Sequence, residues 1–404
     1  MPVLSPMFRT ALILGLLAAV EAFAIDMYLP AMPEITRALG TDIATMQTTL
    51  TLYFVAFGLA QLIWGPLADQ YGRKPPLYAG MGLFVLASVG CALAPTVGWL
   101  TGFRILQGLG AAAAMVVPRA VIRDMYTGAQ ATRIMAMVML VISVSPMLAP
   151  LAGSAILAVA GWRDIFWALV VAGGVGIYLL ARHQPETLPP ARRVRVDVAS
   201  LLRGSRILLR DPVFMGLTFV GGFGFASFFV FIASATYVYT DQYGLTPTGF
   251  SVAFAINAIG FFAASQLAGP LSERYGITRI VRLAVVGFAA CCLILLAVVI
   301  AGGGSLAVVV AGLFAGNAFL GLVIPTTMVM ALDPHGEIAG LASSLGGALQ
   351  MTAAGLMVTL AGPFFDGTAL PMVATIAVCA VLTLAVALWV LPRVVVEPEI
   401  AAAL

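Results

Sequence analysis

Twelve long apolar runs determine what this chain can fold into. A helix that crosses the hydrocarbon core of a membrane, which is about 30 Å thick, needs roughly 20 apolar residues. Of the 404 residues, 62% are hydrophobic and only 9% are charged, whereas soluble domains carry about 25% charged residues. The runs lie near residues 9–31, 43–68, 76–94, 99–119, 132–159, 163–182, 212–239, 248–272, 279–301, 305–331, 337–363 and 370–392. We therefore predict an all-α membrane protein with twelve transmembrane helices.

The basic residues are unevenly distributed between the loops, and this distribution predicts the orientation of the chain. Cytoplasmic loops are enriched in Lys and Arg. The loops after the even-numbered runs carry Arg73, Lys74, Arg123, Arg192, Arg193, Arg195, Arg203, Arg206, Arg210, Arg274 and Arg279. The opposite loops offer only Arg37 and Arg163. We predict that both termini are cytoplasmic. Because the chain has no polybasic tail, nucleic acid is not an expected partner.

One connection, residues 183–211, is much longer than the others and separates six runs from six. We expect an N-terminal six-helix bundle at 1–182, a cytoplasmic linker at 183–211 and a C-terminal six-helix bundle at 212–404. The first part of the linker, QPETLPPARR, is polar and rich in proline, as linkers are. The second part, VDVASLLRGSRILLRD, is either a short helix that begins at Asp197 and lies on the cytoplasmic face, or a solvated segment.

A short motif repeats across this linker. Residues 65–73 read GPLADQYGR after the second run, and residues 269–277 read GPLSERYGI after the eighth, 204 residues later. Two six-helix halves related by an axis along the membrane normal are the plan of one large class of transporters. The repeat therefore predicts two pseudo-symmetric bundles with a substrate cavity between them, near the bilayer midplane.

Further segments give the chain a family resemblance. Residues 65–75, GPLADQYGRKP, resemble the loop signature of the major facilitator superfamily. Four others narrow the resemblance to the Bcr/CflA family of drug:proton antiporters: AIDMYLPAMP (24–33), FRILQGLGAAAA (103–114), RAVIRDMY (119–126) and GWRDIFW (161–167). The chain departs from the antiporter signature of the fifth helix, where Ala149-Pro150 stands in place of the usual Gly-Pro.

The resemblance implies an exporter of small lipophilic drugs that is driven by protons. It implies a bacterial inner-membrane location, a monomer surrounded by lipid, and no cofactor. Another facilitator, such as a sugar or metabolite transporter, is the alternative, but the aromatic-rich seventh and eighth runs favour lipophilic substrates. A membrane-embedded enzyme is disfavoured because the only two histidines, His183 and His335, lie in loops. No G-x-x-x-x-G-K-[ST] loop is present for nucleotide binding.

Three formal charges stand well inside the apolar runs: Glu21, Asp26 and Arg104. Each costs at least ~2.5–3.5 kcal/mol at the membrane centre, so such groups usually face the protein interior and function there. Asp26 and Arg104 lie at matching depths, about 6 and 7.5 Å from the outer ends of their helices. A carboxylate that meets Arg104 in one conformation and a drier pocket in another would hold its proton with different strength.

Proton coupling by Asp26 and Arg104 therefore agrees with the acid in helix 1 and the arginine in helix 4 of the family. A static Asp26–Arg104 pair that locks two helices together is the alternative interpretation. Glu21 lies five residues from Asp26, about 140° around the helix. It either attracts cationic compounds into the cavity, or serves as a second proton site, or is a protonated, hydrogen-bonded interior glutamate. The 204-residue offset places Val230 and Val308 at the equivalent positions, so proton chemistry belongs to the N-terminal half.

Aromatic and amide side chains within the runs are candidates for substrate contact. Aromatic rings stack on flat apolar compounds, whereas intramembrane amides more often hold helices together. The candidates are Tyr28, Tyr53, Gln61, Gln107, Phe225, Phe229, Phe254, Asn257, Asn317 and Gln350. For each of them, packing between helices or against lipid is the competing interpretation. Gly108 and Ala112 form a small-x-x-x-small strip that predicts close helix packing, without a binding role.

A separate set of charges flanks the short loop after the second run. Asp69 precedes this loop, and the start of the eleventh helix, near residues 336–340, is expected beside it. The positive end of a helix dipole favours a carboxylate by about 0.3–1 kcal/mol. We predict an inner gate made by Asp69, Arg73, Arg119 and Arg123, with Arg119 or Arg123 as the partner of Asp69.

Overall fold

The computed structural model of the chain describes residues 6–126, 128–193 and 197–402. The elements in these ranges are all helical: α1 (Pro6–Asp26), η1 (Leu29–Ala31), α2 (Met32–Ala38), α3 (Ile43–Tyr71), α4 (Lys74–Ala92), α5 (Val97–Met125), α6 (Gly128–Val159), α7 (Trp162–His183), η2 (Pro190–Arg192), α8 (Val198–Arg210), α9 (Pro212–Tyr237), η3 (Val238–Gln242), α10 (Pro247–Tyr275), α11 (Ile277–Ile300), α12 (Leu306–Leu332), η4 (Asp333–Ile338), α13 (Ala339–Ala361), η5 (Gly362–Phe364) and α14 (Ala369–Ala402).

Twelve helical segments within the described ranges are long and apolar enough to cross a membrane, which confirms the predicted number. Most of them begin and end within a few residues of the predicted runs. The largest differences are at the first span, which continues through η1 and α2 to Ala38, and at the fourth, which continues to Met125. Helices extend past the apolar run because their last turns carry polar residues into the membrane surface.

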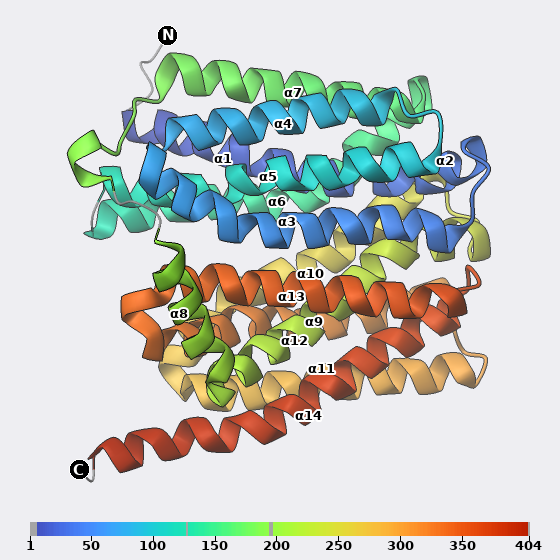
Figure 1. Ribbon diagram of the computed structural model, residues 1–404. Helices are drawn as coiled ribbons and strands as arrows, with labels where there is room; N and C mark the ends of the chain where they lie inside the picture. Colours follow the sequence, from blue (N-terminus) through green and yellow to red (C-terminus); the bar gives the residue numbers. More distant parts are fainter. Residues whose placement is uncertain (1–5, 127, 194–196, 403–404) are drawn as a thin grey trace. The chain divides into compact units, whose positions relative to one another are not determined.

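The chain divides into two compact units, Met1–Asp197 and Val198–Leu404. The division lies inside the predicted linker, so the proline-rich part of that linker belongs to the first unit. The second part forms α8, a helix of 13 residues that packs on α9 and α13 of the second unit (Figure 1). This segment is therefore helical, and its place on the cytoplasmic face stays a prediction.

The internal repeat is visible in the backbone. Helices α3 and α10 have 29 residues each, and both their first and their last residues are 204 positions apart. Each contains a proline five residues before its last residue, Pro66 in α3 and Pro270 in α10. Each ends at a glycine with positive φ, +96° at Gly72 and +83° at Gly276. Only glycine adopts that conformation without steric cost, so both halves of the motif need it there.

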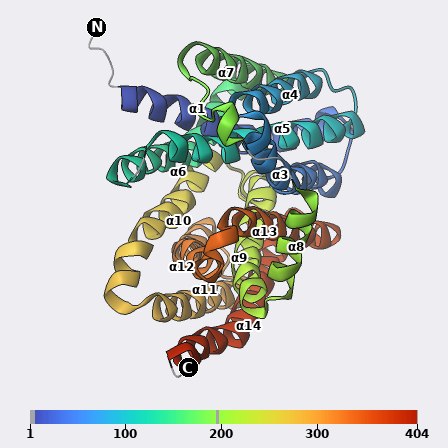
Figure 2. The ribbon, with the colours of Figure 1, turned by 60° about the vertical axis from the view of Figure 1, so that its left-hand side comes forward.

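Helix packing within each unit follows the same plan. In the first unit, α5 packs on α3 and α4, and α1 packs on α5, α6 and α7. In the second unit, α12 packs on α10 and α11, and α9 packs on α12, α13 and α14 (Figure 2). These pairs correspond one to one when each span is shifted by six. The predicted repeat of two six-helix bundles is therefore confirmed within each unit.

Small residues set the closest approaches between these helices. A Cβ on Gly108 of α5 would lie 2.5 Å from the carbonyl oxygen of Tyr53 in α3. At the corresponding crossing, a Cβ on Gly321 of α12 would lie 2.2 Å from the carbonyl oxygen of Phe261 in α10. Because real Cβ atoms do not come so close to other atoms, a larger residue would push the backbones apart. The predicted packing role of Gly108 is thereby confirmed.

Candidate functional site

Arg104 is the most deeply buried charge in the described part of the chain, with none of its side chain exposed. Its Nη1 atom donates to the carbonyl oxygen of Ala24 at 2.9 Å and to Oε1 of Gln107 at 2.6 Å. Ala24 lies in the last turn of α1, where carbonyl groups have no partner within the helix. The guanidinium therefore caps the negative end of the α1 dipole, an arrangement that favours a cation.

Two tyrosine rings enclose the same guanidinium. Its central carbon lies 4.6 Å from the ring centroid of Tyr28 and 4.3 Å from that of Tyr53. A desolvated cation over an aromatic face is stabilised by about 2 kcal/mol. Both rings are fully buried, and the Tyr28 hydroxyl is held by Thr49 Oγ1 at 2.8 Å. The two predicted substrate contacts, Tyr28 and Tyr53, are thus the walls of the Arg104 site.

Three buried polar atoms at this site have no hydrogen-bond partner among the described residues: Nε and Nη2 of Arg104 and the hydroxyl of Tyr53. An unpaired buried donor costs about 1–3 kcal/mol. Such a cost is retained at functional sites when another conformation supplies the missing partner. Arg104 is therefore able to receive a further acceptor without giving up the two bonds that it already makes.

Asp26 is the last residue of α1, and only 4% of it is exposed. The bond from Arg104 to Ala24, two residues earlier, shows that the two groups lie at about the same level, as predicted. The static Asp26–Arg104 pair is not formed, however: the ion pairs among the described residues are Asp69–Arg73, Asp124–Arg73 and Asp211–His335. In this state the arginine binds the backbone at the end of α1 in place of the carboxylate.

Glu21 is partly exposed on α1, five residues before Asp26. Its part as a second proton site stays a prediction.

Gln107 extends this site to a neighbouring helix. Its Nε2 atom donates to Ser88 Oγ at 2.8 Å, and Ser88 donates to the carbonyl oxygen of Phe84 at 2.7 Å. The chain of bonds thus runs from α1 through Arg104 and Gln107 of α5 to α4. Ser88 was not predicted, because a single serine in an apolar run carries no signal of its partner.

The other predicted substrate contacts belong to different surroundings within their own units. Gln61 is half-buried on α3, and the remaining six belong to the second unit. There the amides join helices: Asn317 Nδ2 donates to Asn257 Oδ1 at 3.4 Å, and Gln350 Nε2 donates to the carbonyl oxygen of Thr218 at 3.4 Å. The aromatic residues stack in pairs, Phe225 on Phe229 (5.9 Å between centroids) and Phe254 on Phe231 (5.5 Å). Their substrate role stays a prediction.

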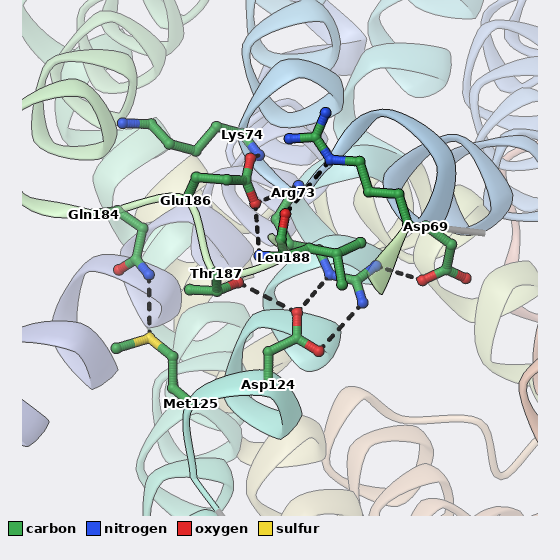
Figure 3. Close-up of polar contacts among 10 residues, drawn as sticks. Asp69, Arg73, Lys74, Asp124, Met125, Gln184, Glu186, Thr187 and Leu188 are labelled. Carbon is green, nitrogen blue, oxygen red and sulfur yellow. Dashed lines mark hydrogen bonds and ion pairs between the residues drawn. The ribbon is translucent and has the colours of Figure 1, made fainter. Parts of the chain in front are cut away.

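A second polar cluster lies at the loop between α3 and α4, and Figure 3 shows its centre at Arg73. Arg73 is 4% exposed and binds Asp124 twice, from Nε at 2.7 Å and from Nη2 at 3.2 Å. Its Nη1 atom binds Asp69 at 2.5 Å. The partner of Asp69 is therefore Arg73, four residues later in the sequence. The predicted pairing with Arg119 or Arg123, both of which are exposed on α5, is wrong in this structure.

The proline-rich segment after α7 is held against this loop (Figure 3). The carboxylate of Glu186 accepts N–H bonds from Arg73 (2.9 Å), Lys74 (3.1 Å) and Leu188 (2.9 Å). Thr187 donates to Asp124 at 3.2 Å. Partial burial raises the pKa of Glu186, but the N–H bonds outweigh it and hold the pKa below its ordinary value of 4.5. The acid thus caps the start of α4 from a segment more than 100 residues away.

Residues 14–356 match the family model described as Major Facilitator Superfamily. The chain is 34% identical to the uncharacterized MFS-type transporter YdgK of Bacillus subtilis, over 92% of each chain. It is 28% identical to the bicyclomycin resistance protein homolog of Haemophilus influenzae, over 93% of this chain and 94% of that protein. Among solved structures it is similar to a D-xylose-proton symporter, with a TM-score of 0.75, 15% identity, and coverage of 96% of this chain and 97% of the symporter.

Proposed function

The chain belongs to the major facilitator superfamily, its relatives agree with the Bcr/CflA branch, and we propose that it exports small lipophilic compounds, antibiotics among them, in exchange for protons. The observation that carries this proposal is the similarity to a bicyclomycin resistance protein homolog over nearly the full length of both chains. Bicyclomycin is an antibiotic, and the seventh and eighth spans of this chain are rich in the aromatic residues that suit apolar substrates.

We place the protein in the bacterial inner membrane as a monomer, with both termini in the cytoplasm. The support is the concentration of arginine in the loops after the even-numbered spans. In this orientation, α8 and the Arg73 cluster face the cytoplasm. The cluster then forms the inner gate, in which Asp124 holds Arg73 in place and the contact between Arg73 and the exposed Asp69 is made and broken.

The proton is carried by Asp26, in our proposal, with Arg104 as the group that controls it and Glu21 as a second acid. Support comes from the burial of Asp26 and from the two unpartnered donors of Arg104. Rocking of helices against one another could bring the Asp26 carboxylate to those donors, which favours release of its proton. When the arginine returns to Ala24 and Gln107, the carboxylate is left in an apolar site, where the protonated form is favoured.

The experiment measures proton release from purified protein in detergent on addition of drug, followed with a pH-sensitive dye. The drug is chosen from an inhibition panel of antibiotics and dyes, in which cells expressing the protein are compared with cells that lack it. Wild-type protein is expected to release protons, and Asp26→Asn is expected to bind neutral drugs without release. Asp42→Asn, which alters an exposed acid at the start of α3, serves as the matched control.

Two results would overturn parts of this proposal. If expression raises resistance to no compound in the panel, the export of antibiotics is refuted. If Asp26→Asn releases protons as the wild type does, Asp26 is structural; loss of release in Glu21→Gln would then assign the proton to Glu21. Arg104→Ala is expected to abolish release as well, with lower stability because Ala24 and Gln107 lose their donor.

A further inference from the structure

Helix α8 is fixed to the second unit along one side. Its Leu208 is fully buried. Gly204, one turn earlier on the same side, lies so close to α13 that a Cβ there would be 2.6 Å from Leu341 Cδ2. Residues four positions apart share one face of a helix. This face, made by Gly204 and Leu208, therefore determines which residues of α8 point away from the protein.

The opposite face combines apolar and basic side chains. Leu202 is 66% exposed, Ile207 53% and Leu209 47%. Arg203, Arg206 and Arg210 are exposed on the same face. Helical spacing arranges them in two adjacent rows, 202–206–209 and 203–207–210, so arginines and large apolar residues alternate. The 13 residues of α8 include no acidic residue, so nothing on the helix itself neutralises this face.

The chain fixes the level of α8 relative to two spanning helices of its own unit. One residue after α8 ends, Asp211 accepts the N–H groups of Val213 and Phe214 and so caps α9. Gly204 lies against the first turn of α13. Figure 1 shows α8, in green, running across α9 and α13 near their ends instead of along them. A helix of about 20 Å therefore lies where two spans enter the hydrocarbon.

We infer that the outer face of α8 binds anionic membrane lipid, with its three arginines on the lipid phosphates and its three exposed apolar residues among the acyl chains. Guanidinium groups bind phosphate with two parallel hydrogen bonds. Helices at the membrane surface bury their apolar side by about 5–10 Å, and an anionic leaflet attracts basic residues beside it. Asp211, the acid that follows α8, already accepts N–H groups of α9 and pairs through Oδ2 with Nε2 of His335, at 2.8 Å.

Lipid bound here would hold α8 against the first turn of α13. The Asp211–His335 pair already joins the segment before α13 to the junction of α8 and α9, so the lipid would stabilise one connected region. The inference requires only that α9 and α13 cross a membrane, and it stands whether or not the protein exports drugs.

In the first test, the full-length protein is released from membranes made of phosphatidylcholine and phosphatidylglycerol. Native mass spectrometry then counts the phosphatidylglycerol molecules that the protein retains. The variant combines Arg203→Gln, Arg206→Gln and Arg210→Gln. The control removes the same charge from the same unit by Arg274→Gln, Arg279→Gln and Arg282→Gln, all exposed at the α10–α11 connection. Affinity for phosphatidylglycerol should fall about fivefold per arginine removed from α8 and change little in the control.

The second test places a cysteine at position 202 and follows its reaction with a polar maleimide in vesicles. Three of the four native cysteines are buried and one is half-buried, so the new thiol reacts first. We expect slower reaction when phosphatidylglycerol is present than in phosphatidylcholine alone. Equal rates, or equal retention of phosphatidylglycerol by the two triple variants, would refute the inference. Equal retention of both lipids by the wild type would show a purely apolar contact and refute recognition of charge.

Discussion

The bond between Arg104 and Gln107 is the contact of the buried site that a double-substitution cycle can isolate. Both side chains are completely buried, and the bond of 2.6 Å runs from a charged donor to an amide acceptor. Hydrogen bonds to charged groups contribute about 1.5–3 kcal/mol. We therefore expect Arg104→Met and Gln107→Met to be coupled by about 1.5–3 kcal/mol, the double variant being less destabilised than the sum of the single ones.

The single substitutions should each lower the free energy of unfolding. Arg104→Met leaves the Ala24 carbonyl and Gln107 Oε1 without a donor, at about 1–3 kcal/mol each, and removes two ring contacts. Relief of the buried charge offsets part of this cost, so about 2–4 kcal/mol is expected in total. Gln107→Met also deprives Ser88 of its donor and should cost about 2–3 kcal/mol.

The assay is unfolding of the purified protein in mixed micelles by increasing fractions of a denaturing detergent. A second cycle, Arg104→Met with Gln61→Met, is the control. Gln61 lies eight residues beyond Tyr53, about 12 Å further along α3, so these effects should add within about 0.5 kcal/mol. A coupling below about 0.5 kcal/mol between Arg104 and Gln107 would mean that their bond contributes nothing to the folded state.

Three further outcomes are expected. Asp69→Asn should impair transport while drug binding at equilibrium persists and stability changes by less than about 1 kcal/mol, because Asp69 is 51% exposed; loss of binding with normal cycling would contradict the gate. The pKa of Glu186 is lowered from its ordinary value of 4.5. The contribution of Glu186 to the stability of its segment is therefore complete above the ordinary pKa and is lost as pH falls through the pKa of the folded state. Hydrogen exchange of residues 184–193 should therefore rise below about pH 4.5, and Glu186→Gln should abolish that dependence. A reporter active only in the periplasm, fused after Val396, should be silent, and strong activity would refute the orientation.

The spans could be predicted closely because bilayer thickness sets their length whatever their neighbours are. The repeated motif also corresponds to a repeated backbone conformation. A glycine with positive φ follows α3 and another follows α10, so the Gly shared by both copies of the motif meets a requirement of the backbone. The level of Arg104 relative to Asp26 followed from counting residues along two helices of opposite direction. That reasoning needs only the helical rise, and the bond to Ala24 agrees with it.

Hydrogen bonds between side chains and backbone groups could not be predicted from the sequence. Arg104 binds the carbonyl of Ala24, and Glu186 binds N–H groups of Arg73 and Lys74. Every residue has such groups, so their availability depends on where a helix ends and what lies beside it. The expected pairing of Asp69 was wrong for a related reason, since the sequence does not show that Asp124 draws Arg73 into the cluster at the inner end of α3. Asp124 lies within RAVIRDMY, one of the motifs that carry the family resemblance.

The attachment of the linker at both of its ends shortens the tether between the two units. The connection predicted at 183–211 has 29 residues, enough to allow wide and independent movement. At its beginning, Glu186 binds the backbone of Arg73, Thr187 binds Asp124 of α5, and the Arg193 side chain lies beside Gly72. At its end, α8 packs on α13. The span from Arg193 to Val198 that remains can reach at most about 18 Å when fully extended. Lengthening this stretch with glycine and serine should therefore relax a mechanical limit on transport. Lengthening the chain between Leu188 and Arg193 would instead disturb the contacts that hold the linker to the loop at Arg73.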